Sequence, residues 1–140
     1  MMDRSKSLLF ASVAALLFMM PQTVYGKDSD ALEFTKDSLD TVKKNVREGD
    51  AILVDVRDLV EWNAGHVRDA IHLPWRDLQG KKVDAMLENL PKDKVIYTYC
   101  AVGYRSSRAG KIIAKYKFDV RPLKPGFEEL VKAGFDSEKK

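Results

Sequence analysis

Cysteine is the scarcest reactive residue in this sequence, because Cys100 is the only thiol among 140 residues. No internal disulfide can therefore form. Histidine is nearly as rare, and its two residues, His66 and His72, lie six positions apart with a single acid, Asp69, between them. No second cluster completes a set of ligands, so the pattern argues against a metal site.

The sequence also lacks an apolar run of the roughly 20 residues that a membrane-spanning helix needs. Its one long run, residues 8–20, follows the basic residues Arg4 and Lys6 and precedes small residues that end at Gly26. This order is typical of a secretory signal peptide. We expect residues 1–26 to be removed and the mature protein to be periplasmic or secreted, without stable membrane insertion; an uncleaved leader that tethers the protein is the alternative.

Charge of one sign is not in excess. The chain has 24 basic and 21 acidic residues, and loss of two basic and one acidic residue with the leader leaves a net charge of +2. Such a balance does not favour a nucleic-acid partner. The length suits one domain, which we place at residues 31–136, and we expect it to be a monomer.

The hydrophobic pattern of the mature chain alternates between strand and helix. Two short apolar runs, residues 51–56 and 94–99, are typical of strands buried on both faces. Briefer strands are predicted at residues 71–73 and 120–123. Helical spacing predicts helices at residues 36–48 (with Thr35 as N-cap), 59–63, 82–89, 127–133 and after Cys100. Strands interleaved with helices favour an α/β fold with a parallel sheet.

Cys100 lies where the second buried strand ends and a helix begins. Backbone N–H groups of the short loop between them can converge on one point, the helix N-terminus adds partial positive charge, and Gly103 permits unusual backbone angles. An unpaired cysteine can be a buried structural residue or a nucleophile, and this loop favours the thiolate. Arg105 either adds charge at the rim or is solvated, while Ser106 and Ser107 are expected to cap or solvate the helix start.

Three parts of the sequence resemble the rhodanese family, and the resemblance covers residues 31–135. The parts are residues 53–57 with 61–67 and 70–74, the loop at 100–106, and residues 123–127. The resemblance implies a rhodanese-like α/β domain with a central parallel sheet of five strands and helices on both faces. It implies no metal and no organic cofactor.

The resemblance also assigns roles to individual residues. Cys100 would be the nucleophile that forms a persulfide. The substrate anion would lie against the loop that follows, formed by Ala101, Val102, Gly103, Tyr104 and Arg105. The family positions that support this loop are occupied by Asp55, Arg57, Glu61 and His66.

The activity that follows is transfer of a sulfane sulfur from a small sulfur-containing anion such as thiosulfate. Cyanide would be the acceptor in vitro, and a thiol or protein cysteine would be the natural one. A persulfide carrier or binding module that acts with a protein partner is the alternative. A phosphatase or arsenate reductase is disfavoured, because those enzymes place five residues between cysteine and arginine, whereas Arg105 follows Cys100 after four.

The sequence departs from the family at several positions. Asp69 stands where glycine is usual, Pro125 replaces the first of two glycines, and Leu130 occupies a position often held by tryptophan. Ala101 and Val102 are apolar, whereas thiosulfate-preferring relatives often carry basic residues early in this loop. The identity of the donor therefore stays open.

Overall fold

The computed structural model describes residues 29–140, and the predicted leader lies outside them. Its centre is a parallel sheet in the order β3–β1–β4, formed by Ile71–His72, Ala51–Asp55 and Val95–Tyr99. β1 pairs with β4 along its whole length and with β3 through Val54–Ile71 and Asp55–His72. The predicted α/β class is confirmed, but among residues 29–140 this sheet has three strands instead of five.

The segment expected as a strand at residues 120–123 does lie beside β4. The N–H of Arg121 donates to the Ile96 carbonyl at 2.8 Å, and the N–H of Leu123 donates to the Thr98 carbonyl at 2.9 Å. It forms only one isolated bridge, between Ile96 and Val120, and Pro122 contributes no N–H to the pairing. This edge of the sheet is therefore irregular.

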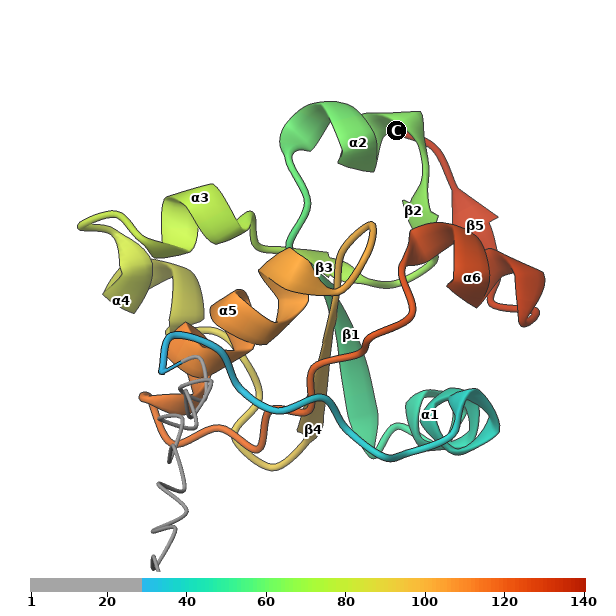
Figure 1. Ribbon diagram of the computed structural model, residues 1–140, viewed down its shortest axis with the longest axis horizontal. Coiled ribbons are helices and arrows are strands. Elements are labelled where there is room, and N and C mark those ends of the chain that lie inside the picture. The colour runs from blue at the N-terminus through green and yellow to red at the C-terminus, as the bar shows by residue number, and fades with distance from the viewer. Residues whose placement is uncertain (1–28) are drawn as a thin grey trace, which may run out of the picture.

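A second, antiparallel sheet was not expected from the sequence. It joins β2 (His66–Val67) to β5 (Ser137–Glu138), so paired structure continues beyond residue 136. Each strand has only two residues, too few to show an alternating pattern. This pairing brings the C-terminal end of the chain against the segment that follows α2 (Figure 1).

Six helices surround the parallel sheet in the described part of the chain: α1 (Leu39–Arg47), α2 (Leu59–Ala64), α3 (Trp75–Leu78), α4 (Val83–Leu87), α5 (Tyr104–Ala114) and α6 (Phe127–Lys132). The helices predicted at residues 59–63, 82–89 and 127–133 are present within one or two residues, and α3 was not expected. None of the helices within residues 29–140 is long and apolar enough to cross a membrane.

Side chains of β1 and β4 alternate between two cores, one on each face of the sheet. One core faces α3, α4 and α5 and includes Val54, Ile96, Leu78, Leu87 and Ile113. The other faces α1 and α6 and includes Leu53, Tyr97, Val42 and Leu130. Figure 1 shows the two groups of helices on opposite sides of β1 and β4, which confirms the prediction of helices on both faces.

α1 begins later than its pattern predicts. Ser38 caps it, because the Ser38 hydroxyl accepts the N–H of Thr41 at 3.2 Å. The predicted cap, Thr35, instead accepts the N–H of Asp37 at 3.1 Å, and the Asp37 carboxylate accepts the hydroxyl of Tyr97 at 2.6 Å. This tertiary contact holds the preceding residues outside the helix, so the predicted start was wrong.

Two of the departures from the family pattern have a structural account. Asp69 has φ 63°, a left-handed conformation that glycine adopts freely and aspartate tolerates. Leu130 is 0% exposed and fills the core beneath α6, as a larger apolar side chain would.

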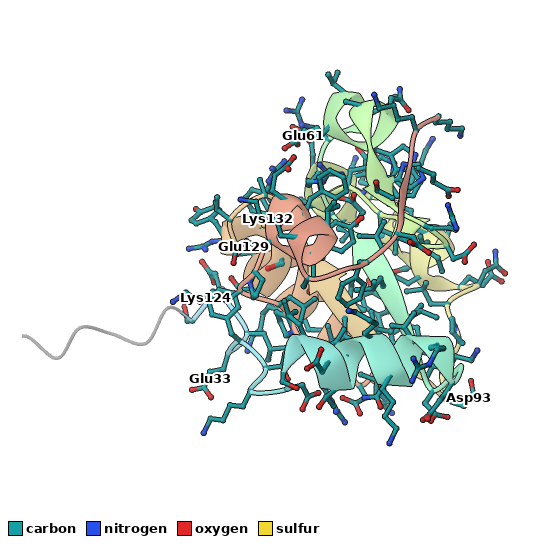
Figure 2. All side chains as sticks on the ribbon, turned by 90° about the vertical axis from the view of Figure 1, so that its right-hand side faces the viewer. Glu33, Glu61, Asp93, Lys124, Glu129 and Lys132 are labelled. Carbon is teal, nitrogen blue, oxygen red and sulfur yellow. The ribbon has the colours of Figure 1, made fainter. Side chains whose placement is uncertain are left out.

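The parallel strands all end at the same edge of the sheet. Asp55 ends β1, and Cys100 directly follows β4. Figure 2 shows Glu61 of α2 at this end of the molecule and Asp93, which precedes β4, at the other. Ligands of open parallel sheets bind beyond the carboxyl ends of the strands, so the structure directs attention to the loop after β4.

Candidate active site

Cys100 lies at the base of the loop that joins β4 to α5. Its Sγ accepts the N–H of Gly103 at 3.0 Å, so the loop curls around the sulfur. The Cys100 residue is 0% exposed, while Ala101 and Val102 lie on the surface. The sulfur is thus held inside the loop and covered by it.

The loop also presents backbone donors that nothing in the described part of the chain accepts. The N–H groups of residues 101, 102, 104 and 105 donate to no acceptor within residues 29–140. Those at the start of α5 are the orphan donors of a helix N-terminus, where the dipole of an 11-residue helix favours negative charge. An anionic sulfur group bound beside Cys100 can therefore be stabilised by these amides.

Gly103 has the conformation that the loop sequence predicts for it. Its φ is 89°, in the left-handed region. A Cβ atom at this position would lie 3.0 Å from the carbonyl oxygen of Lys124 and 3.2 Å from the ring of Phe34. Both the backbone angle and the close neighbours therefore require glycine here.

Gly126 fixes the other side of the loop. A Cβ atom on Gly126 would lie 1.8 Å from the carbonyl oxygen of Ala101, so two backbone segments touch directly. The next residue, Phe127, donates its N–H to the carbonyl of Cys100 at 2.9 Å. The sequence marked this segment only through the family resemblance, and no local pattern showed that it supports the loop.

Ser106 ties these two segments together and does not solvate the helix start. Its hydroxyl lies 2.8 Å from the carbonyl oxygens of both Gly103 and Leu123, and the residue is 0% exposed. The hydroxyl of Thr98 donates to the Ser106 carbonyl at 2.9 Å. Ser106 was expected to cap or solvate the helix start; its hydroxyl does bond the Gly103 carbonyl there, but it is buried, because the segment that contains Leu123 covers this side of α5.

Arg105 is bound by Glu61. Its two terminal nitrogens donate to the two Glu61 oxygens at 2.6 and 2.8 Å, and Asp58 lies 3.8 Å away. The hydrogen bond from Arg105 holds the pKa of Glu61 below its ordinary value, despite partial burial, and the pKa of Arg105 is raised by the same bond. This pair joins α2 to the loop and leaves the guanidinium largely neutralised.

Asp55 and Arg57 form a second, buried pair at the end of β1. The Arg57 terminal nitrogen donates to Asp55 at 2.7 Å and to the carbonyl of Gly65 at 2.6 Å. The guanidinium also lies 4.4 Å from the ring centre of Phe127. Burial opposes the charge, but the bonds to Asp55 outweigh it and raise the pKa of Arg57. The pair therefore links β1, the turn after α2 and the segment that touches the loop.

His66 supports α2 and does not contact the reactive loop. Its ring stacks on Trp62 with centroids 3.4 Å apart, and its Nδ1 lies 2.9 Å from the Trp62 carbonyl. Its Nε2 lies 3.3 Å from Glu138 of β5. Trp62 also stacks on His72 at 4.7 Å, so it is a packing residue between two imidazoles.

A thiol at the carboxyl edge of a parallel sheet, enclosed by a loop of backbone donors, defines a class of α/β proteins that bind an anion beside a cysteine. Within this class the chain belongs to the rhodanese-like domain family, whose model matches residues 38–133. The presence of this domain supports the assignment of the protein as a sulfurtransferase-type enzyme.

Two related proteins are distant from this chain in sequence and are much longer than the segment that matches it. The chain is 30% identical over 95 residues to a tRNA uridine(34) hydroxylase of Hamiltonella defensa, covering 65% of this chain and 26% of the relative. It is 32% identical over 91 residues to an adenylyltransferase and sulfurtransferase of Vanderwaltozyma polyspora, covering 60% and 21%. The match therefore spans about a quarter of these proteins.

Solved structures share the fold. The rhodanese-like domain of an Anabaena protein has a TM-score of 0.62 and 28% identity to the chain, with 74% of this chain and 78% of that one covered. The likeness spans a large part of both chains. It places the fold described above within the same structural family.

Replacing Glu61 by glutamine should destabilise the protein in a pH-dependent way. Because the pKa of Glu61 is lowered in the folded state, its contribution is complete above the ordinary carboxyl pKa of about 4.3 and is lost as pH falls through the lowered value. We expect a loss of about 1 kcal/mol at neutral pH that shrinks as the pH falls below the ordinary carboxyl value, measured by urea unfolding.

The control for this experiment is Glu129→Gln, on the exposed side of α6 (Figure 2). It should change the free energy of unfolding by less than about 0.5 kcal/mol at either pH. A Glu61→Gln effect of equal size at neutral and acidic pH would show that the ion pair with Arg105 is not the cause.

Gly126→Ala should open the reactive loop, because its Cβ cannot be placed beside Ala101 without moving one backbone segment. We expect a loss of about 1–3 kcal/mol in unfolding free energy and faster reaction of Cys100 with an aromatic disulfide reagent. The matched control is Gly49→Ala, where φ is 80° but nothing lies within 4 Å. That control should lose about 1 kcal/mol and keep the thiol reaction rate; equal thiol rates in all three proteins would contradict the role of Gly126.

Proposed function

We propose that this protein is a sulfurtransferase that carries a sulfane sulfur as a persulfide on Cys100. The observation that carries the proposal is the Cys100 Sγ held by the Gly103 N–H within a loop of uncommitted backbone donors. A persulfide adds a second sulfur about 2 Å beyond Sγ, so the transferable atom is not confined to the buried position of the thiol. The name of the Vanderwaltozyma polyspora relative includes sulfurtransferase, in agreement with this chemistry.

The reaction divides into two displacements at sulfur. In the first, the Cys100 thiolate attacks the outer sulfur of a donor such as thiosulfate, the sulfur–sulfur bond of the donor breaks, and sulfite leaves with the electron pair. In the second, an acceptor attacks the outer sulfur of the persulfide and Cys100 recovers its electron pair. Cyanide serves as acceptor in vitro, and a thiol or protein cysteine in vivo. Neither step needs a cofactor, because cysteine is both nucleophile and carrier.

Recognition of the donor rests on backbone amides more than on side-chain charge. Arg105 is the only arginine in the loop, and Glu61 accepts hydrogen bonds from both of its terminal nitrogens. A phosphatase-like role for Arg105 would need this guanidinium to face the substrate instead of Glu61. The pairing therefore favours sulfur transfer over phosphate chemistry.

A persulfide carrier that delivers sulfur only to a partner protein is the second candidate. One observation favours a protein acceptor. Val102, which belongs to the reactive loop, is apolar and 77% exposed. A carrier of this kind would be loaded by a donor but would release its sulfur to cyanide slowly. Turnover with small molecules alone separates the two readings.

Incubation with thiosulfate should add the mass of one sulfur atom to the protein, and cyanide should remove it with formation of thiocyanate. Cys100→Ser should show neither change, because it removes the thiol in the chain. Intact mass spectrometry and thiocyanate assay measure the two steps. Ser107→Ala, which alters a nearby hydroxyl that lies 3.1 Å from the Tyr104 carbonyl, is the control and should keep the adduct.

Failure of the folded protein to gain sulfur from thiosulfate would remove thiosulfate as donor. Gain of sulfur without release to cyanide would favour the carrier. An adduct that persists in Cys100→Ser would refute the persulfide mechanism.

We also propose that the mature protein begins at Lys27 and acts as a monomer in the periplasm or outside the cell. The order of basic residues, apolar run and small residues in the leader supports export. Full-length expression in a bacterium should yield exported protein whose intact mass starts at Lys27 and which elutes as one chain. Full-length mass in the membrane fraction would instead support the uncleaved tether.

A further inference from the structure

Three large apolar side chains that remain exposed form an apolar rim at the reactive loop. They are Phe34, Val102 and Tyr104, while Leu59 and Val60 are exposed on α2. Val102 and Tyr104 belong to the loop and the start of α5, and the ring of Phe34 lies next to Gly103. Leu59 and Val60 precede Glu61 on α2, and the Glu61 carboxylate accepts a hydrogen bond from Arg105. Exposed apolar side chains that cluster in this way mark interaction surfaces.

A groove runs from this apolar rim along α5. It has a volume of about 300 Å³ and lies between three segments, which are residues 29–30, α3 with the following Gln79, and α5 with the following Lys115. Trp75, Tyr104, Arg108, Lys111 and Ile112 also line it. The rings of Trp75 and Tyr104 meet edge to face at 6.0 Å, and the Arg108 guanidinium lies 3.7 Å from the Tyr104 ring centre. The end of the groove nearest Cys100 therefore has an aromatic wall.

The groove is cationic. Arg108, Lys111 and Lys115 are three and four residues apart, so they follow one face of α5. No carboxylate in the described part of the chain lies within ion-pair distance of Lys111 or Lys115. Asp30 is the one acid among the described residues that line the groove. The site is therefore complementary to a negatively charged segment.

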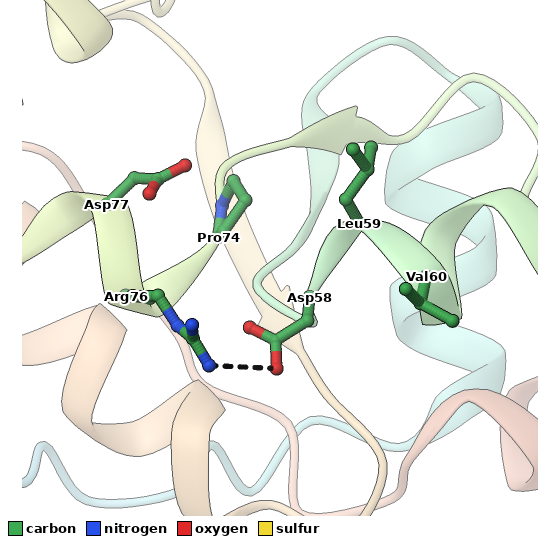
Figure 3. Close-up of a pocket in the computed structure, with 6 residues that line it drawn as sticks. All are labelled: Asp58, Leu59, Val60, Pro74, Arg76 and Asp77. Carbon is green, nitrogen blue, oxygen red and sulfur yellow. Dashed lines mark ion pairs between the residues drawn. The ribbon is translucent and has the colours of Figure 1, made fainter.

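A second groove between α2 and α3 lacks this charge. Figure 3 shows its lining, in which Asp58 and Asp77 outnumber Arg76, and Arg76 lies 3.8 Å from Asp58. Leu59 and Val60 form its apolar edge. The distribution of charge therefore selects the α5 groove for an anionic partner.

We propose that the sulfur acceptor is a protein that presents a cysteine within an apolar segment, with acidic residues that bind along the α5 groove. This inference rests on the proposed function. The acceptor thiolate attacks the outer sulfur of the Cys100 persulfide, the bond between the two sulfurs breaks, and its electron pair returns to Cys100 Sγ. The acceptor leaves as a persulfide, so the transfer needs no oxidant or reductant.

The length of the groove determines how far the acidic residues of the acceptor can lie from its cysteine. From Tyr104 to Lys115 the helix rises about 16 Å, which about five residues of extended chain can span. Acidic residues within about five positions of the acceptor cysteine would therefore reach Lys111 and Lys115. A folded acceptor needs this segment on its surface and in extended form.

The test compares synthetic peptides that share one cysteine between leucines and differ only in four flanking residues, aspartate or lysine. The probe reaction is transfer from the persulfide-loaded full-length protein, followed by intact mass. We expect the aspartate peptide to react about tenfold faster than the lysine peptide, with the difference shrinking in high salt. Equal rates for the two peptides, or a preference that salt does not change, would overturn the proposal.

Lys111→Glu with Lys115→Glu should abolish or reverse this preference and keep the rate with cyanide, which is too small to contact the groove. The matched control is Lys44→Glu with Arg47→Glu on α1, which should preserve the preference for the aspartate peptide. Val102→Gln should slow both peptides about equally, because it removes an exposed apolar side chain of the loop. A preference that survives the α5 double variant would refute the groove as the docking site.

The reaction with cyanide distinguishes failure of this docking proposal from failure of the proposed sulfurtransferase function. Absence of transfer from the unmodified protein to cyanide and to both peptides means that the sulfurtransferase proposal fails. Transfer to a peptide without transfer to cyanide means that the protein is the carrier described above. Transfer to cyanide without discrimination between peptides means that only the docking proposal fails. If the α5 double variant does not fold, the peptide preference and salt dependence of the unmodified protein decide.

Discussion

Direct contact between two stretches of backbone holds the reactive loop in place. Gly126 lies against the carbonyl of Ala101, and the N–H of Phe127 binds the carbonyl of Cys100. These contacts need a residue without a side chain at position 126. Because the same segment reaches Ser106 through Leu123, the loop is held from its first residue to the first turn of α5. The arrangement around the sulfur therefore depends on a segment more than 20 residues away in the sequence.

Two ion pairs extend this support to the other side of the site. Asp55 and Arg57 join the end of β1 to the turn after α2, and Glu61 on that helix binds Arg105. Since both arginines have carboxylate partners, they order the chain more than they attract a free anion. The chemistry at Cys100 then relies on backbone dipoles, which are fixed in position and do not titrate. A site of this kind can stabilise a persulfide while its surroundings remain apolar.

Local patterns predicted the regular centre of the fold well. β1 and β4 were predicted within one residue because continuous apolar runs are what strands buried on both faces require. The position of Cys100 between β4 and a helix followed from the same pattern. Patterns failed where other parts of the chain compete: Asp37 binds Tyr97 and delays α1, and the two-residue strands β2 and β5 are too short to have a period. The family resemblance, and not residue spacing, pointed to Asp55, Arg57, Glu61 and His66.

The sequence by itself determined the α/β class, the lone thiol and the glycine-containing loop that surrounds it, because strand, helix and left-handed glycine each have local signatures. Only the tertiary structure decided which residues touch that loop. It paired Arg105 with Glu61, placed Gly126 against Ala101, and buried Ser106. It also placed the aromatic rings of Trp75 and Tyr104 together at one end of a cationic groove. These are contacts between segments that lie far apart along the chain, and no local period or propensity encodes them.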